Sequence, residues 1–409
     1  MGVVIATATI LFVLMLAISV WRTWLNPVLL APIAWAPAIV FSSLDVEFTM
    51  PFYRVLNRGM DVSTYLCIAV AFVSYTIGAI AIRSLPVKSA GRSLPKTYSC
   101  VPARTDMLAL FFLVGLAVFV YAFRQSGLGE QLTAERTEVY ESRLAFHVGF
   151  VNHFLLLMDV TAVIFFAKFL ETSRIRFALP MVLGLLCYLA TLQKSRVLFR
   201  VLSAAFIAFI YKEEAKRIFL GTRTRGLMTG LAVVFLLIAL ALTNLIRGIG
   251  IARYTDLESP LVEQLFIYSG APALLNLSAT MAGVIPSDPP SLGAIMLRPF
   301  LWDFVDRDLL NPTRYLGGIN NGTSLIFYWQ DFRLLGIVLI PFFVGAIVSV
   351  FIALAQRRSP FGLVAGAMGF YAIVLSVYTD VVFEPTTAIT LALAAVVDMV
   401  SRRRPERVC

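Results

Sequence analysis

Charged side chains are scarce in this 409-residue sequence. Asp, Glu, Lys and Arg together make up 14% of the residues, whereas soluble domains contain about a quarter. Hydrophobic residues account for 59%, and the mean hydropathy is +0.85. This balance excludes an ordinary soluble domain and predicts a polytopic membrane protein.

Histidine and cysteine are also scarce. The two histidines, His147 and His153, and the four cysteines lack the spacing of a zinc site. The cysteines fall inside predicted spans or in predicted cytoplasmic segments, so none is placed for an external disulfide. The sequence contains no phosphate-binding glycine loop, Walker motif or nucleophile elbow. We therefore expect neither a metal site nor a bound cofactor.

Long apolar runs dominate what is present. At roughly 20 residues per span, the sequence predicts an all-α bundle of about eleven transmembrane helices, of which the sixth and seventh are short and nearly continuous. Gly345, in the ninth, is expected to allow close helix packing. The expected spans are 2–20, 26–43, 64–82, 106–123, 148–170, 177–193, 196–211, 227–246, 335–355, 361–380 and 385–400.

Basic residues are unevenly distributed between alternate loops. The loop charges sum to +16 on one side of the membrane and −3 on the other. The positive-inside rule makes the first side cytoplasmic. We therefore expect an external N-terminus, a cytoplasmic C-terminus and two external segments, the charged loop 124–147 and the long interval 247–334. The formal net charge of +10 is thus a topology signal, and nucleic acid is not an expected partner.

The interval 247–334 contains six arginines, eight acidic residues and no lysine. The planar arginine fork suits phosphate oxygens better than the point charge of lysine does. A general preference for arginine explains the composition equally well, because the whole chain has 28 Arg and 6 Lys. Apolar runs in the interval predict helices at the membrane surface or in the bundle, including one that starts at Ser259-Pro260. Candidate ligands of phosphate here are Arg247, Arg253 and Arg298.

Lys194, Arg196 and Arg200 lie on the external side, where positive charge is otherwise scarce. Arg196 and Arg200 are four residues apart and share a helix face, so they can grip adjacent phosphates. The alternative is that these interfacial cations snorkel to lipid head groups. Asp159, in the fifth span, would be costly at mid-membrane and should face the bundle interior or a hydrated cavity.

The loop 124–147 is expected to form a short charged helix that carries Arg136 and Arg143. Its acids and bases are spaced to neutralise one another partly. A solvated surface helix and a functional one are equally consistent with this pattern. The two external segments also carry the carboxylates Glu135, Glu138, Asp303 and Asp331.

Several of these features together resemble a known family, the bacterial oligosaccharide repeat unit polymerases, or Wzy-type O-antigen polymerases. They are about eleven spans, the step Lys194-Ser195-Arg196 that opens a helix, Arg247 at the exit of a long helix, a long external loop, and Asp331-Phe332-Arg333-Leu334-Leu335-Gly336 leading into the next helix. In the family, the stretch that corresponds to 331–336 tends to have the form Phe-Gly-x-x-Gly. The first of these two glycines is missing here, which is a departure from the family pattern.

The resemblance implies a single transmembrane domain over 1–409 with a GT-C-like helical bundle, in the bacterial inner membrane. The implied reaction is metal-independent transfer of a growing glycan from undecaprenyl pyrophosphate to an incoming lipid-linked unit at the periplasmic face. Membrane lipids and a chain-length regulator protein are further implied partners. On this basis, we expect Arg136, Arg196 and Arg247 to be catalytic. The expected substrate-binding residues are Arg143, Lys194, Arg200, Arg253, Arg298 and Asp331.

Two other functions remain as alternatives. An O-antigen ligase resembles this chain in outline, but ligases of that type use a histidine in the large external loop, and no histidine follows His153. A transporter or flippase for anionic glycolipid would commonly carry charge through the membrane interior, whereas the predicted spans contain few ionisable residues, such as Asp159 and Asp398.

Overall fold

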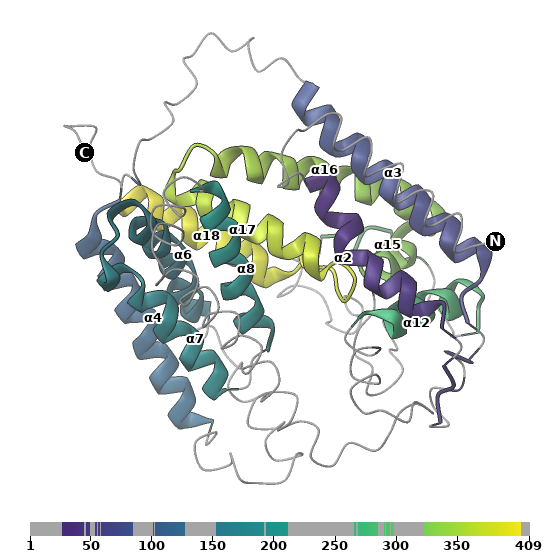
Figure 1. Cartoon of the computed structure of the whole chain (residues 1–409), viewed down its shortest axis with the longest axis horizontal. Helices are drawn as coiled ribbons and strands as arrows, with labels where there is room; N and C mark the ends of the chain where they lie inside the picture. Colours follow the sequence, from purple (N-terminus) through teal and green to yellow (C-terminus); the bar gives the residue numbers. More distant parts are fainter. Residues whose placement is uncertain are drawn as a thin grey trace, which may run out of the picture. The chain divides into compact units, whose positions relative to one another are not determined.

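The structure is a computed structural model. It describes residues 27–44, 46–49, 54, 56–57, 59–84, 101, 103–126, 153–191, 194–211, 266, 269–284, 290, 292–294, 296–297 and 323–401. Within these residues the secondary structure is helical and contains no β-strand. The helices are α2 (Pro27–Ser42), α3 (Val62–Ser84), α4 (Thr105–Gln125), α6 (Leu155–Thr172), the 3-10 helix η3 (Ile175–Phe177), α7 (Leu179–Ala190), α8 (Lys194–Ile210), α12 (Ala271–Met281), α15 (Ser324–Phe332), α16 (Leu334–Ala355), α17 (Pro360–Leu375) and α18 (Pro385–Ser401) (Figure 1).

Nine of the eleven expected spans coincide with described helices. The other two, 2–20 and 227–246, lie outside the described residues. Among the described helices, three are long and apolar enough to cross a membrane: Val62–Ile82, Thr105–Gln125 and Leu334–Ala355. The protein is therefore all-helical in its described part and has the character of a membrane protein, as the composition predicts.

Several helix ends differ from the expected spans, including those of α6, α7 and α17. The expected span 177–193 begins instead with η3 and continues as α7, which has Pro180 as its second residue. Proline suits the first turn of a helix, where its missing N–H has no partner to lose, so α7 starts there. The expected span 361–380 also ends early, because α17 stops at Leu375.

The chain groups into two compact units, each assembled from separated stretches of sequence. The expected single transmembrane domain over 1–409 stays a prediction. The first unit comprises 1–91, 252–350 and 369–387, and the second comprises 92–251, 351–368 and 388–409.

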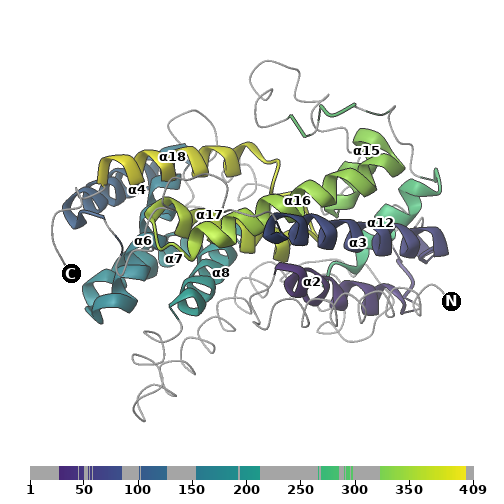
Figure 2. The same ribbon diagram turned by 90° about the horizontal axis from the view of Figure 1, so that it is seen from above.

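In the first unit, α12 is buried from Ala271 to Thr280 and packs against α2, α3 and α15. The apolar run at 271–281 in the long interval therefore folds as a helix, as expected. Gly78 of α3 and Gly345 of α16 let these two helices approach closely, because an added Cβ at either position would overlap with a backbone carbonyl of the other helix. The expected role of Gly345 is thus confirmed. Figure 2 shows α15 leading directly into α16.

In the second unit, α6 lies against α4, α7 and α8 (Figure 1 and Figure 2). Most of its residues are buried, from Leu155 through Phe165. Gly115 of α4 faces the backbone of Met158 so closely that an added Cβ would overlap with it. This tight packing holds the middle of α6, with Asp159, inside the unit.

Candidate functional site

Asp159 is the buried centre of a polar cluster in the second unit. Its side chain is 0% exposed and lies on α6 among apolar neighbours. The expectation that this carboxylate faces the bundle interior is confirmed. A buried carboxylate is costly unless cations or hydrogen bonds compensate for its lost hydration, and α7 and α8 supply both.

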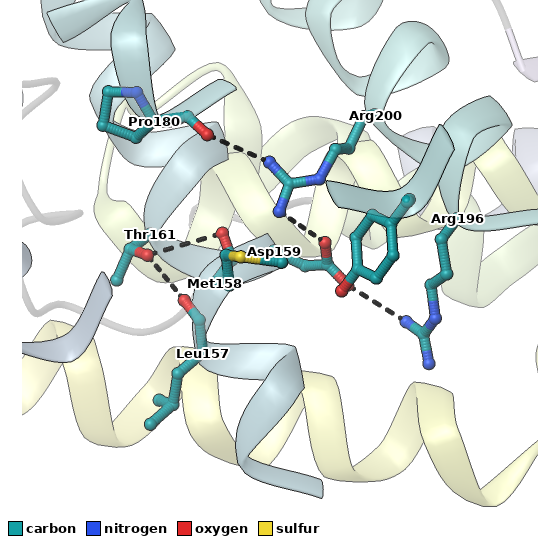
Figure 3. Close-up of polar contacts among 8 residues, drawn as sticks. Leu157, Met158, Asp159, Thr161, Pro180, Arg196 and Arg200 are labelled. Carbon is teal, nitrogen blue, oxygen red and sulfur yellow. Dashed lines mark hydrogen bonds and ion pairs between the residues drawn. The ribbon is translucent and has the colours of Figure 1, made fainter. Parts of the chain in front are cut away.

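Arg196 and Arg200 of α8 contact the two oxygens of this carboxylate, as Figure 3 shows. Arg196 Nη1 lies 3.2 Å from Asp159 Oδ2 and donates a hydrogen bond to it. Arg200 Nη2 lies 2.9 Å from Oδ1, within ion-pair distance but off the hydrogen-bond direction. The four-residue spacing therefore puts both arginines on one helix face, as predicted.

The side chain of Arg200 is buried among residues of α6 and α7. Its side chain is 1% exposed. Its Nη1 donates to the carbonyl oxygen of Pro180 at 3.3 Å, and its guanidinium lies 5.2 Å from the ring centre of Tyr188. Gly184 faces the guanidinium so closely that a Cβ there would overlap with it. Arg200 is thus a part of the packed interior of the second unit, and the role expected for it in substrate binding stays a prediction.

Arg196 connects the buried carboxylate with the protein surface. Its side chain is 24% exposed, and the oxygen it contacts also accepts a hydrogen bond from the Tyr188 hydroxyl at 3.1 Å. The Asp159 carboxylate thus holds the Arg196 guanidinium in one orientation, and a planar guanidinium of this kind suits phosphate oxygens.

The structure places the other predicted site residues as follows. Arg136, Arg143, Arg247, Arg253 and Arg298 lie outside the described residues, so their convergence on Arg196 stays a prediction. Lys194 is the first residue of α8, and its side chain is likewise outside the described part.

Asp331 belongs to the first unit. Its side chain is buried in α15, and Asp331 Oδ2 accepts the backbone N–H of Met296 at 3.0 Å. The backbone carbonyl of Asp331 in turn accepts the N–H of Leu292 at 3.1 Å. Asp331 therefore ties the segment 292–297 to α15. The role expected for it in substrate binding stays a prediction.

Sequence reasoning did not identify the contributions of Gly184 and Tyr188. Pro180, Gly184 and Tyr188 recur every four residues along α7, so they share one face of that helix. A glycine between a proline and a tyrosine on one face was the available signal for a bulky polar side chain packed against α7. Within the described residues, no group of three or more His, Cys, Asp or Glu side chains is placed to hold a metal ion.

Comparisons with known protein families, with curated proteins and with solved structures found no match to this chain.

Proposed function

We propose that the protein is a membrane glycosyltransferase that polymerises undecaprenyl-pyrophosphate-linked oligosaccharide repeat units into a surface polysaccharide. The observation that supports this function best is the Arg196–Asp159–Arg200 cluster, in which a partly exposed arginine is oriented by a buried carboxylate. The proposed location is the bacterial inner membrane, with the reaction at the periplasmic face. A chain-length regulator protein is a proposed partner.

The proposed reaction forms one glycosidic bond and breaks one bond to pyrophosphate. A sugar hydroxyl of the incoming lipid-linked unit attacks the anomeric carbon of the growing glycan. The bond between that carbon and the pyrophosphate oxygen breaks, and its electron pair stays on undecaprenyl pyrophosphate. The hydroxyl proton passes to a base, for which Glu135, Glu138, Asp303 and Asp331 remain candidates.

Arg196 has the chemistry to stabilise this leaving group. Negative charge grows on the pyrophosphate as the bond breaks, and a preoriented cation lowers the energy of that transition state without reorganising first. Asp159 holds the Arg196 guanidinium in one orientation. Arg200 also pairs with Asp159, so Arg196 does not have to neutralise this carboxylate alone. Arg136 and Arg247 are proposed to act with Arg196 on the same pyrophosphate.

The same cluster also gives support to a second function, transport of an anionic glycolipid. An ion-paired Asp159 inside an apolar helical unit resembles the buried charge that membrane transporters use along their substrate paths. In that function, Arg196 would bind the pyrophosphate group during passage and no glycosidic bond would form.

Gel analysis of surface polysaccharide after deletion of the gene distinguishes the two functions. Loss of a polymerase leaves single repeat units attached to the cell surface, because export and attachment still proceed. Loss of a transporter or of a ligase leaves no repeat units there. Single units after deletion, with long polymer restored by the wild-type gene, are the expected result. An absence of surface units would contradict polymerisation and favour transport or ligation.

A further inference from the structure

The first unit contains a pocket that the proposed reaction does not use. It encloses about 540 Å³ of space, counting all volume between its atoms and at its mouth. Its walls come from α2, α3, α15, α16, the end of α17 and the turn that follows. All the lining residues belong to this one unit.

The pocket lies level with the middle of two helices that are long and apolar enough to cross a membrane. Phe72, which lines it, is the central residue of the stretch Val62–Ile82 of α3. Val344, which also lines it, is one of the two central residues of α16. The two centres are at one level, because Gly345 lies so close to the backbone carbonyl of Tyr75 that an added Cβ would overlap with it. In a bilayer that both helices cross, the pocket therefore lies near the midplane.

The outer surface of these two helices is apolar at the level of the pocket. Val70 and Val73 of α3 and Leu339 and Phe343 of α16 are exposed, and each lies within one turn of a residue that lines the pocket. Exposed apolar side chains at the middle of a spanning helix contact lipid hydrocarbon. Lipid chains are therefore the material that surrounds this part of the unit.

The inner walls of the pocket are mostly apolar as well. Several of their polar side chains form hydrogen bonds within the wall. Trp35 Nε1 donates to Ser376 Oγ at 2.7 Å, and Ser376 Oγ donates to the carbonyl oxygen of Ile373 at 2.7 Å. The Tyr328 hydroxyl donates to Asp380 Oδ1 at 3.5 Å. Among the described residues that line the pocket, none is Lys, Arg or His. The pocket therefore suits the chain of a lipid better than its phosphate head group.

We infer that this pocket binds the methyl end of a fatty acyl chain from a bilayer lipid. An empty pocket would deprive its wall atoms of dispersion contacts on one side. Water would fill it poorly, because a buried water molecule needs several polar partners and the walls are mostly apolar. Acyl chains reach the midplane with their methyl ends and can restore the missing contacts. This inference does not depend on the proposed glycosyl transfer.

Photo-crosslinking tests the inference. The full-length protein is reconstituted in phosphatidylcholine vesicles that contain a small fraction of phosphatidylcholine with a diazirine in one acyl chain, either near the methyl end or near the ester. Labelled residues are mapped by mass spectrometry. We expect the methyl-end probe to label Phe72, Tyr75 and Val344, and the ester-end probe to label them far less. The exposed Val73 and Phe343 report contact with the surrounding lipid.

Two outcomes would overturn the inference. One is label on Val73 and Phe343 without label on Phe72, Tyr75 and Val344, because chains would then surround the helices without entering the pocket. The other is equal label on the pocket from the two probes, because the pocket would then not select the methyl end of a chain. This comparison uses the wild-type protein and depends on no variant.

Variants that fill the pocket then separate its occupant from the surrounding lipid. Ala71→Phe and Val344→Phe add volume from two different helices, and each should reduce the methyl-end label on Tyr75 several-fold. Val73→Phe and Val338→Phe change exposed positions of the same two helices and are the matched controls. Gel filtration shows which variants fold. Undiminished label on Tyr75 in a folded Ala71→Phe or Val344→Phe variant would contradict the assignment.

An isoprenoid chain is the other source of hydrocarbon at this depth. The acyl chain is proposed because it belongs to the bulk lipid around the unit. Unlabelled polyprenyl phosphate, added to the vesicles at the same mole fraction as the probe, should therefore leave the acyl label on the pocket unchanged. Loss of that label would show that the pocket prefers an isoprenoid chain and would overturn the assignment to an acyl chain.

Discussion

Arg196 and Arg200 contact opposite oxygens of Asp159, yet only Arg196 is partly exposed. The partly exposed guanidinium and the buried one therefore lie one turn of helix apart. The sequence alone left two explanations for these arginines, phosphate binding and snorkelling to lipid. The structure adds a third, an internal ion pair that both arginines make with Asp159.

The first prediction at the residue scale concerns Arg196→Lys. Lysine keeps the charge but loses the planar fork, so it cannot contact Asp159 and a phosphate oxygen with fixed geometry. Removal of one donor to a developing oxyanion costs about 3 to 4 kcal/mol, and we expect clearly shortened surface polymer at normal protein level. Polymer length on gels, with protein level measured by blot, is the readout. Arg136→Lys and Arg247→Lys should behave alike.

Arg357→Lys is the control for this series, because Arg357 lies in the turn between α16 and α17, on the expected cytoplasmic side. Full-length polymer from all three external variants, equal to that of the control, would rule out the proposed arginine site.

The second prediction concerns the buried ion pair. Asp159→Asn leaves the guanidinium of Arg200 buried without its carboxylate, a change that costs about 3–5 kcal/mol in buried pairs. We expect a marked fall in thermal stability, measured as soluble protein after heating in detergent. Adding Arg200→Met removes the uncompensated charge, so the double variant should recover much of the loss. It should still make short polymer, because nothing orients Arg196.

Asp106→Asn is the comparison for stability, since Asp106 and its partner Arg104 are both largely exposed and such pairs contribute about 0–1 kcal/mol. A double variant no more stable than Asp159→Asn would show that the fall has another cause than the buried charge.

At the scale of elements, the sequence predicted where the helices lie but not which side chains of different helices contact one another. Apolar runs of span length placed nine helices, because burial in lipid or protein demands such runs. The four-residue spacing also placed Arg196 and Arg200 on one face. Their partner could not be predicted, because Asp159 is 37 residues before Arg196 and the pairing depends on how α6 and α8 rotate against each other. The fit of Arg200 against Gly184 depends on the same tertiary packing.

The end of α6 provides a prediction that depends on pH. Glu171 lies one residue beyond the expected span 148–170, and its Oε1 accepts the N–H of Val101 at 2.7 Å and the Tyr211 hydroxyl at 2.9 Å. Burial raises the pKa of Glu171 above its ordinary value of 4.5, although both hydrogen bonds and the charges of Lys168 and Arg358 oppose the rise. The folded protein therefore binds this proton more tightly than the unfolded chain does.

A raised carboxyl pKa favours the folded state at low pH, and that contribution is lost as pH rises from 4.5 through the folded pKa. Glu171→Gln keeps an acceptor oxygen but has no charge to bury. We therefore expect its melting temperature to rise relative to wild type as pH increases over this window. Melting curves at several pH values measure the difference, with the exposed Glu47→Gln as control. A difference that shrinks with rising pH would show that the ionised form of Glu171 is the stabilising one.

At the scale of the whole molecule, the helices assemble into two compact units that draw on separated stretches of the chain. This grouping could not be predicted from the sequence, because hydropathy identifies spans without showing which spans pack together. The expected membrane orientation comes from loop charge and is independent of that packing, so it can be tested separately.

The charge difference between the two sets of loops, +16 against −3, predicts that 247–334 lies outside the cell and 212–226 inside. Reporter fusions after Arg225 and after Pro290 should therefore report the cytoplasm and the exterior respectively. Lys194, Arg196 and Arg200 are exceptions to this distribution, because they place three cations on the expected external side. Their placement there is consistent with a pyrophosphate bound at the outer leaflet. The reverse fusion result would mean that Arg196 lies on the cytoplasmic side, and it would remove the physical basis for polymerisation at the periplasmic face.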